Sequence, residues 1–310
     1  MRPGRRPSCE DPLTQVEASA RPRRPGLPRP PLAALPAALL VVGLGLAPLA
    51  LIAFWSFWRF DPATYWITPD YTLASYAALM DTGRLPVLLR TLGLSALTAA
   101  LATLLALPAA AVIGLMSGPR KAAVLIALFT VPFFTSALIR AFAWRLVLGR
   151  NGAINQTLVA AGLIDEPLEW LLFSNFAVIV GMLAAYLPFA VVPLVLAFGR
   201  IEPSVIRASQ DLGAGFWTTF RRVILPLVLP GAVAGFLFVF VVALGTSSEI
   251  QLLGGAGDSS ISIMINDVMR VVNFPLAFAI ATVVVAVAVA VLLVAVRFFR
   301  LSKLFEDLGT

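Results

Sequence analysis

The chain is 310 residues long, 60% of them hydrophobic and 13% charged, and its formal net charge is +7. Ordinary soluble domains are roughly 45–50% apolar and about 25% charged, so the composition indicates a membrane protein. The chain has no histidine and one cysteine, Cys9. This excludes a disulfide within the chain and predicts no metal site built on imidazole or thiolate ligands.

Much of the charge lies in the first 31 residues, where seven arginines stand against Glu10, Asp11 and Glu17 and give +4 of the total. This Pro-, Arg- and Ser-rich segment has little to bury, which predicts a disordered basic tail at residues 1–31. We expect it to contact anionic lipid weakly rather than nucleic acid. A cleaved signal peptide is the alternative, but the following apolar run reaches Trp58, and a signal core spans only about 7–15 residues.

Uncharged runs long enough to cross a bilayer occur repeatedly, since a spanning helix needs about 20 apolar residues. Five such runs are residues 30–58, 91–119, 170–199, 223–248 and 271–296. A sixth run, 122–139, is shorter and continues past Arg140 to Trp144. The sequence therefore predicts an all-α membrane protein with six transmembrane helices in a domain covering residues 32–300.

The orientation follows from the basic residues near the span ends, because Lys and Arg are retained on the cytoplasmic side. With both termini inside, 16 basic residues lie on the cytoplasmic side, and four, Arg59, Arg84, Arg150 and Arg270, lie outside. We expect both termini in the cytoplasm, with residues 301–310 as a cytoplasmic C-terminal tail.

The segment between the fourth and fifth spans, 200–222, is too polar to insert and is amphipathic. One helical face carries Val205, Ile206, Ala208 and Leu212. Gly213 is expected to end this helix, because glycine adopts positive φ without strain.

A second short helix is expected after the turn, with Phe216 and Phe220 four residues apart on its apolar ridge. An apolar surface outside the membrane with no partner in the chain predicts docking of a soluble protein.

No phosphate-binding G-x-x-x-x-G-K-[ST] loop occurs, and the glycine cluster 254-GGAGDSS-260 lacks the lysine. Uphill transport would therefore draw on an ion gradient or on another subunit. The chain is not expected to be an enzyme itself.

Residues 200–226 resemble the cytoplasmic loop of binding-protein-dependent ABC importer permeases, whose pattern is E-A-A, three residues, G, nine residues, I-x-L-P. The matching residues are Arg207, Ala208, Ser209, Gly213, Val223, Leu225 and Pro226. Three of them depart from the pattern, since Arg207 replaces Glu, Ser209 replaces Ala and Val223 replaces Ile. The contact that the Glu would make with the ATPase is not expected here, and Arg207 is placed to pair with Asp211 four residues on.

The resemblance implies a type I ABC importer permease bundle in a bacterial inner (plasma) membrane, with 200–226 as a cytoplasmic coupling-helix loop. It implies three kinds of partner: a cytoplasmic ABC ATPase dimer, a second and related but different permease chain, and an extracytoplasmic solute-binding protein. The chain itself would bind no cofactor, and ATP would be used by the partner ATPase. The implied coupling residues are Arg207, Ala208, Ser209, Asp211, Leu212, Gly213, Ala214, Phe216, Phe220, Leu225 and Pro226.

Four further stretches, 71–80, 131–148, 151–164 and 252–268, are similar to the third span and outer loops of spermidine/putrescine-type permeases. This branch implies a polyamine cargo, and another small solute (amino acid-like, opine, iron or thiamine) is the alternative within the family. Two other classes stay open on the residues alone: a gradient-driven secondary transporter, and a membrane sensor or scaffold.

Charges near membrane depth are candidates for the substrate pathway, because burying one there is expensive. Arg140 either lines the pathway or extends outward to lipid headgroups. Glu249 and Asp267 are acidic groups near the outer mouth, where a cationic polyamine would enter. The run 231-GAVAG-235 predicts a close helix contact without specifying the partner helix.

Overall fold

The computed structural model describes residues 34–80, 83–255 and 257–299, and both predicted tails, 1–31 and 301–310, lie outside the described residues. The chain divides into two units at Ala50. In the first unit the described part is the beginning of helix α1 (Ala34–Trp55), whose side chains from Val42 to Ala50 are exposed. The second unit, from Leu51 onward, holds all the other elements.

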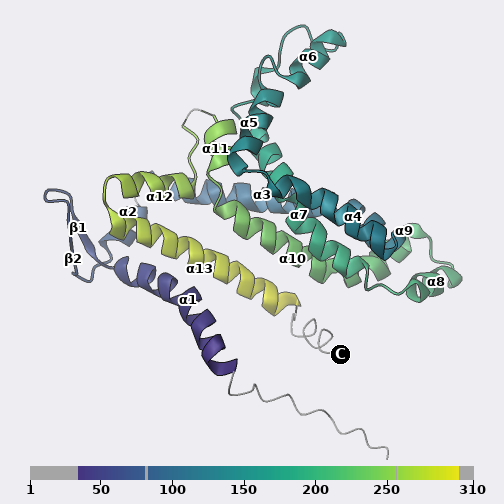
Figure 1. Ribbon diagram of the computed structural model, residues 1–310, viewed down its shortest axis with the longest axis horizontal. Coiled ribbons are helices and arrows are strands. Elements are labelled where there is room, and N and C mark those ends of the chain that lie inside the picture. The colour runs from purple at the N-terminus through teal and green to yellow at the C-terminus, as the bar shows by residue number, and fades with distance from the viewer. Residues whose placement is uncertain (1–33, 81–82, 256, 300–310) are drawn as a thin grey trace, which may run out of the picture. The chain divides into compact units, whose positions relative to one another are not determined.

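Three long helices form the core of the second unit: α3 (Arg84–Ala111), α7 (Asn175–Phe198) and α10 (Leu225–Leu244). Each packs against the other two (Figure 1). In lipid the hydrophobic effect does not drive helices together. Small side chains favour association there because they let helix backbones approach closely. On α3 the fully buried small residues recur every three or four positions: Ala99, Ala102, Ala106 and Ala110.

The run 231-GAVAG-235 makes its close contact with α7. A Cβ added to Gly231 would lie 2.5 Å from the Cβ of Ala197 and 2.9 Å from the carbonyl oxygen of Pro193. One added to Gly235 would lie 3.1 Å from the backbone of Ala190. The predicted close contact is confirmed, and its partner helix is α7.

Four helices are long and apolar enough to cross a membrane: Arg84–Leu115, Asn175–Phe198, Phe216–Leu244 and Phe274–Arg297. A fifth span results if one bent helix pair is counted as a single crossing. The first predicted span contains the shorter apolar helix Val42–Trp55. The structure thus supports a multi-helix membrane domain with four or five spans by length, where the sequence predicts six.

The third predicted span, an unbroken run through 122–139, is wrong as a single helix. The segments Arg120–Phe134 and Ala137–Ala160 meet at 91°. Pro132 lies at this break, and its missing amide hydrogen removes a helix hydrogen bond. The elements along this stretch are α4 (Pro119–Thr130), the 3-10 turn η2 (Val131–Phe134), α5 (Ala137–Leu148) and α6 (Ala153–Ala160).

A second, smaller apolar cluster joins α2 (Ala74–Met80), α12 (Ile261–Arg270) and α13 (Phe274–Phe299) to Leu88 at the start of α3. An antiparallel hairpin precedes α2, with β1 (Arg59–Asp61) paired to β2 (Trp66–Thr68). The remaining elements are η1 (Val112–Met116), η3 (Glu169–Leu171), α8 (Pro203–Asp211), α9 (Phe216–Thr219), η4 (Phe220–Ile224) and α11 (Ser248–Leu253).

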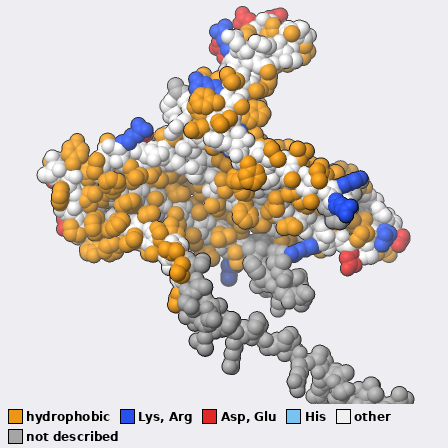
Figure 2. All heavy atoms as spheres, in the orientation of Figure 1, with side chains coloured by type: hydrophobic (Ala, Val, Ile, Leu, Met, Phe, Trp, Pro, Cys, Tyr) orange, Lys and Arg blue, Asp and Glu red, His pale blue; other side chains and the backbone are white. Residues whose placement is uncertain are grey.

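Hydrophobic side chains cover most of the face shown in Figure 2, and charged side chains gather at a few places at its margins. Exposed leucines and valines recur along the spans, for example Leu104 and Leu105 on α3 and Leu293 on α13. A soluble monomer rarely exposes large contiguous apolar patches. The surface therefore fits a lipid environment, in agreement with the composition.

Candidate functional site

The coupling loop, residues 200–226, has the glycine turn that the sequence predicts. Gly213 has φ +78° and ends α8. Its amide donates to the Gln210 carbonyl at 2.8 Å, and the amide of Ala214 donates to the Ser209 carbonyl at 3.1 Å. These two bonds form a Schellman motif, which satisfies carbonyl groups that the end of a helix leaves free.

Two interactions hold α8 against the rest of the domain. The hydroxyls of Ser209 and Thr219 lie 3.0 Å apart, and Thr219 is buried. Ile206 and Phe220 are half-buried and pack against the main core. The loop is therefore a fixed projection of the helix bundle.

Three apolar side chains around the Gly213 turn face outward, and we call them the apolar tip: Leu212, Phe216 and Trp217. They are 89%, 73% and 76% exposed. The ring of Phe216 contacts those of Trp217 and Phe220, with centroids 5.6 and 6.3 Å apart. Beside the tip, a hollow of about 450 Å³ is lined by Trp217, Thr218, Arg221 and Arg222. An exposed aromatic group next to basic residues has the character of an interface anchor, because aromatic residues and arginine dominate binding energy at interfaces.

Two details of the loop differ from the predictions. The predicted second short helix, α9, continues through η4 into α10, so Phe216–Leu244 is one helical run. Within the part of the chain that the structure describes, no ion pair joins Arg207 to Asp211. Both side chains are exposed, so solvent offsets the attraction that an i, i+4 pair would gain.

The other predicted coupling residues have mixed exposure. Ala208 and Pro226 are exposed, whereas Ala214 is half-buried. Leu225 is half-buried against the main core, where it supports the loop from beneath.

Arg140 and Glu249 form a buried pair. Nη2 of Arg140 lies 3.7 Å from Oε1 of Glu249, and the two side chains are 11% and 2% exposed. Nη1 of Arg140 also donates to the carbonyls of Pro132 and Thr135, at 3.2 and 3.3 Å. The structure thus turns Arg140 inward, and the alternative in which it extends toward headgroups is not adopted.

Glu249 belongs to α11, which follows the end of α10 after a short break. Its Oε2 accepts from the hydroxyl of Ser248 at 2.9 Å. Gly181 of α7 leaves room for Leu253, the residue one turn after Glu249, since an added Cβ there would lie 2.5 Å from Cδ1 of Leu253. Removing one partner of such a buried pair is strongly destabilising, by about 3–5 kcal/mol, because the other charge is left uncompensated.

The residues before Glu249 are tied to two other elements. The hydroxyls of Thr246 and Tyr186 on α7 are hydrogen-bonded to each other. The Thr246 carbonyl accepts from the hydroxyl of Ser260 at 3.2 Å, and Ser260 caps the start of α12. The segment that carries Glu249 is therefore fixed to the core on both sides.

Asp267, the third predicted pathway residue, lies exposed on α12. Across the described ranges no ion pair joins it to Arg140 or Glu249, so the structure unites only two of the three. The same ranges contain no cluster of three or more acidic or thiol side chains that would suit a metal ion.

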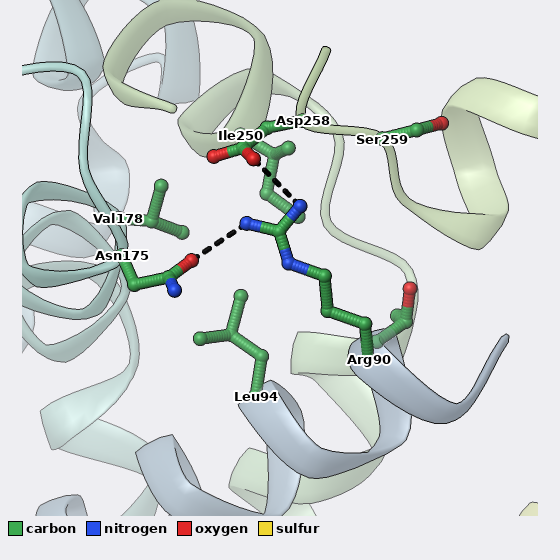
Figure 3. A pocket seen from close by; sticks show the side chains of 8 residues that line it. Arg90, Leu94, Asn175, Val178, Ile250, Asp258 and Ser259 are labelled. Atoms are coloured by element: carbon green, nitrogen blue, oxygen red, sulfur yellow. Dashed lines mark hydrogen bonds and ion pairs between the residues drawn. The ribbon is translucent and has the colours of Figure 1, made fainter. Parts of the chain in front are cut away.

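A second charged cluster connects α3 with α7 and with the segment between α11 and α12 (Figure 3). Nη1 of Arg90 lies 2.6 Å from Oδ1 of Asp258, and Nη2 donates to Oδ1 of Asn175 at 2.7 Å. The amide of Gly255 donates to the second carboxylate oxygen of Asp258 at 2.8 Å. The hydrogen bond from Arg90, and after it the one from the Gly255 amide, hold the pKa of Asp258 below its ordinary value of 3.8.

The cavity beside Arg90 measures about 10 Å³, room for roughly one water molecule. It is too small for a polyamine or any similar solute. The cluster is therefore a structural clamp rather than a cargo site. Sequence reasoning missed Arg90 and Asn175, because nothing in their spacing shows that they meet Asp258.

Trp217 was also not predicted as a coupling residue, although its position in the sequence could have indicated it. It lies directly after Phe216 in a loop that was expected to be solvent-exposed.

Comparison with known proteins shows the family to which this chain belongs. A family described as "Binding-protein-dependent transport system inner membrane component" matches residues 95–306. The chain belongs to this family. The permease resemblance drawn from residues 200–226 is confirmed, and the chain is a multi-pass permease subunit.

Two curated relatives of this permease cover most of its length. The spermidine/putrescine transport system permease protein PotB of Salmonella typhimurium strain LT2 is 34% identical over 225 residues, 72% of this chain and 76% of that protein. The inner membrane ABC transporter permease protein YdcU of Escherichia coli K12 is 33% identical over 248 residues, 76% of this chain and 78% of that protein.

Solved structures show the same fold. A bacterial alginate ABC transporter, in complex with an alginate pentasaccharide-bound periplasmic protein, contains a chain that matches this permease with a TM-score of 0.65 at 19% identity. The match covers 86% of this chain and 93% of that one. A chain of the MetNI methionine ABC transporter matches with a TM-score of 0.50 at 16% identity, over 71% and 98% of the two chains.

Proposed function

We propose that this permease is one of two membrane subunits of an ATP-driven importer that takes up a polyamine such as spermidine or putrescine. The cargo assignment is supported by relatives that are named for spermidine and putrescine transport and are 33% and 34% identical to this chain over 225 residues. ATP is hydrolysed by a separate subunit, in keeping with a chain that has no phosphate-binding loop.

The apolar tip of the coupling loop is the observation that carries the mechanism. Leu212, Phe216 and Trp217 project from the glycine turn and are mostly exposed, and Phe216 stacks on Phe220 at the base of the tip. A groove on the ATPase would bury them, as a helix docks into a groove on a partner protein. Because Ser209 and Phe220 join the tip to the helix bundle, movement of the ATPases would tilt the helices between inward-open and outward-open states.

The topology that we propose has six spans with both termini in the cytoplasm. The distribution of Lys and Arg supports it. Packing supports it as well: a Cβ added to Gly114, in η1 directly after α3, would lie 2.6 Å from Cβ of Phe198, at the end of α7. The basic residues that follow these two helices, Lys121 and Arg200 among them, then belong to the same side of the membrane.

The partners that we propose are an ATPase dimer on the cytoplasmic side, a related but different permease chain, and an extracytoplasmic solute-binding protein. The alginate transporter, whose fold this chain shares, is itself bound to a periplasmic protein. The apolar surface of the spans leaves room for a second permease beside lipid.

The test is co-expression of this chain with its neighbouring candidates for ATPase, second permease and binding protein, followed by purification and reconstitution in liposomes. The proposal predicts copurification with the ATPase, and uptake of labelled spermidine or putrescine that needs ATP and the binding protein and is blocked by vanadate. Uptake that is insensitive to vanadate but abolished by a protonophore would establish a secondary transporter instead. ATP-dependent uptake of another solute would retain the importer and overturn the cargo.

A further inference from the structure

The ion pair between Arg140 and Glu249 is incomplete in this conformation. Its 3.7 Å separation is too long for a hydrogen bond. Nε of Arg140 and Oε1 of Glu249 are both buried and have no hydrogen-bond partner among the residues that the structure describes. A pair that serves stability alone is expected to close these contacts, since buried polar groups are nearly always hydrogen-bonded.

The two partners differ in how they are held. Glu249 lies on the segment fixed through Thr246 to α7 and through Ser260 to α12. Arg140 lies just after the 91° break in the third span. Because α5 itself packs against α7 and α11, the group that can move relative to Glu249 is the long Arg140 side chain, by a change of rotamer.

The break also gives Arg140 a second set of partners. Its Nη1 already donates to the carbonyls of Pro132 and Thr135 beside the break, and the Pro132 carbonyl also accepts from the Thr135 amide. A guanidinium that pivots about Nη1 away from Glu249 keeps these two hydrogen bonds. The carboxylate of Glu249 is then the one charged group of the pair that lacks a partner. Oε1 of Glu249 then accepts a new donor.

We propose that Glu249 is a cation-binding group of the translocation path and that Arg140 is its resident counter-cation, which an ammonium group of the cargo replaces. This inference rests on the cationic cargo proposed above. A primary ammonium is a compact point charge with three donors, whereas a guanidinium is a broad planar fork. An ammonium can therefore approach Oε1 more closely than the 3.7 Å at which the guanidinium lies. The site selects for primary amines and against anions.

The test compares a neutral variant with a charge exchange in the complete reconstituted transporter, with labelled spermidine as the probe. E249Q is expected to lower uptake at least tenfold relative to ATP hydrolysis. The exchange R140E/E249R also stays at least tenfold low, because a fixed cation then stands where the cargo binds. If the pair is only structural, the exchange re-forms it and restores uptake to within twofold of wild type, which would overturn the proposal.

The exposed pair Arg150–Glu169 is the matched control. Its separation is 3.6 Å, but its side chains are 70% and 77% exposed. R150Q/E169Q is expected to transport at the wild-type rate. A tenfold loss in this control as well would overturn the proposal, because the effect would not depend on burial or position.

Binding supplies a readout that does not require transport. In purified transporter, spermidine is expected to raise the melting temperature more in R140Q than in wild type, since no guanidinium has to be displaced, and not at all in R140Q/E249Q. Equal stabilisation of these two variants would contradict a cargo contact with Glu249. If the wild-type transporter takes up neither spermidine nor any other cation, both this inference and the proposed cargo are wrong. If the wild type takes up spermidine and R140E/E249R does so within twofold, only this inference is wrong.

Discussion

The guanidinium of Arg90 and the carboxylate of Asp258 lie 2.6 Å apart and join the start of α3 to the segment between α11 and α12. Asn175, at the start of α7, accepts from the same guanidinium (Figure 3). One arginine therefore connects three parts of the bundle at one end. Its position suits a clamp that holds these elements in register while the rest of the bundle moves.

The clamp predicts a specific dependence on acid. Because Arg90 lowers the folded-state pKa of Asp258, the pair stabilises the protein fully at pH values above about 3.8, and this contribution is lost as the pH falls through the lowered pKa. Asp258→Asn should lower stability by about 1 kcal/mol near neutral pH, the difference between a charge-assisted and a neutral hydrogen bond. The measurement is the melting temperature of both proteins in detergent from pH 7 to pH 3. The difference in melting temperature between the two proteins should stay constant down to about pH 4 and decrease at lower pH. A difference that disappears between pH 7 and pH 5 would contradict the lowered pKa of Asp258.

The contact between α7 and α10 predicts a steric effect. Gly231→Ala places a Cβ 2.5 Å from Ala197 and 2.9 Å from a backbone oxygen that cannot yield easily. We expect a loss of about 1–3 kcal/mol, as for other overpacked sites. Gly93→Ala is the control, because Gly93 is an exposed glycine of α3 with nothing within 4 Å of an added Cβ. It should be neutral or slightly stabilising, and equal losses in the two variants would argue against the close contact.

The glycine turn predicts a loss of coupling. Gly213→Val forces a β-branched residue into positive φ, which costs roughly 1–2 kcal/mol and is relieved by moving the apolar tip. Uptake per ATP hydrolysed should fall at least tenfold in reconstituted vesicles. Gly162 has φ +69° and open surroundings but lies outside the coupling loop, so Gly162→Val carries the same strain without the displacement. If both variants lose coupling equally, strain in general is responsible and not the position of the tip.

The apolar tip predicts an anchor for the ATPase. Trp217→Ala should weaken the affinity of the ATPase by about 2 kcal/mol or more, roughly thirtyfold, as truncation of an interface anchor does. The dissociation constant can be measured with the purified permease pair and the ATPase. Trp66→Ala is the matched control, because Trp66 on β2 is 70% exposed against 76% for Trp217. Unchanged affinity in Trp217→Ala would remove the tip from the interface.

Local features of the loop could be predicted from the sequence. A glycine after an amphipathic run predicts a helix end with positive φ, and Gly213 has that conformation. The spacing from Gly213 to Leu225 and Pro226 was sufficient to suggest the family, which the match over residues 95–306 confirms.

Long-range geometry could not be predicted in this way. Pro132 marks a possible break, but no local pattern gives its 91° bend, because the angle depends on what packs on either side. Arg140 and Glu249 were separate candidates in the sequence, and their pairing follows only from the packing of α5 against α11. Likewise, the partner of 231-GAVAG-235 depends on where α7 lies.

The central claim, that the loop around Gly213 is held by an ATPase, is tested most directly by crosslinking. Leu212 is 89% exposed at the tip of the loop, and Cys9 is the single native cysteine, so Cys9→Ser/Leu212→Cys provides one defined attachment site for a photoactivatable reagent. In membranes that contain the complete transporter, illumination is predicted to give one major adduct with the ATPase subunit, and its yield should change when ATP is trapped with vanadate. Adducts with lipid alone, or labelling of this cysteine by a membrane-impermeant thiol reagent from outside intact cells, would contradict the account.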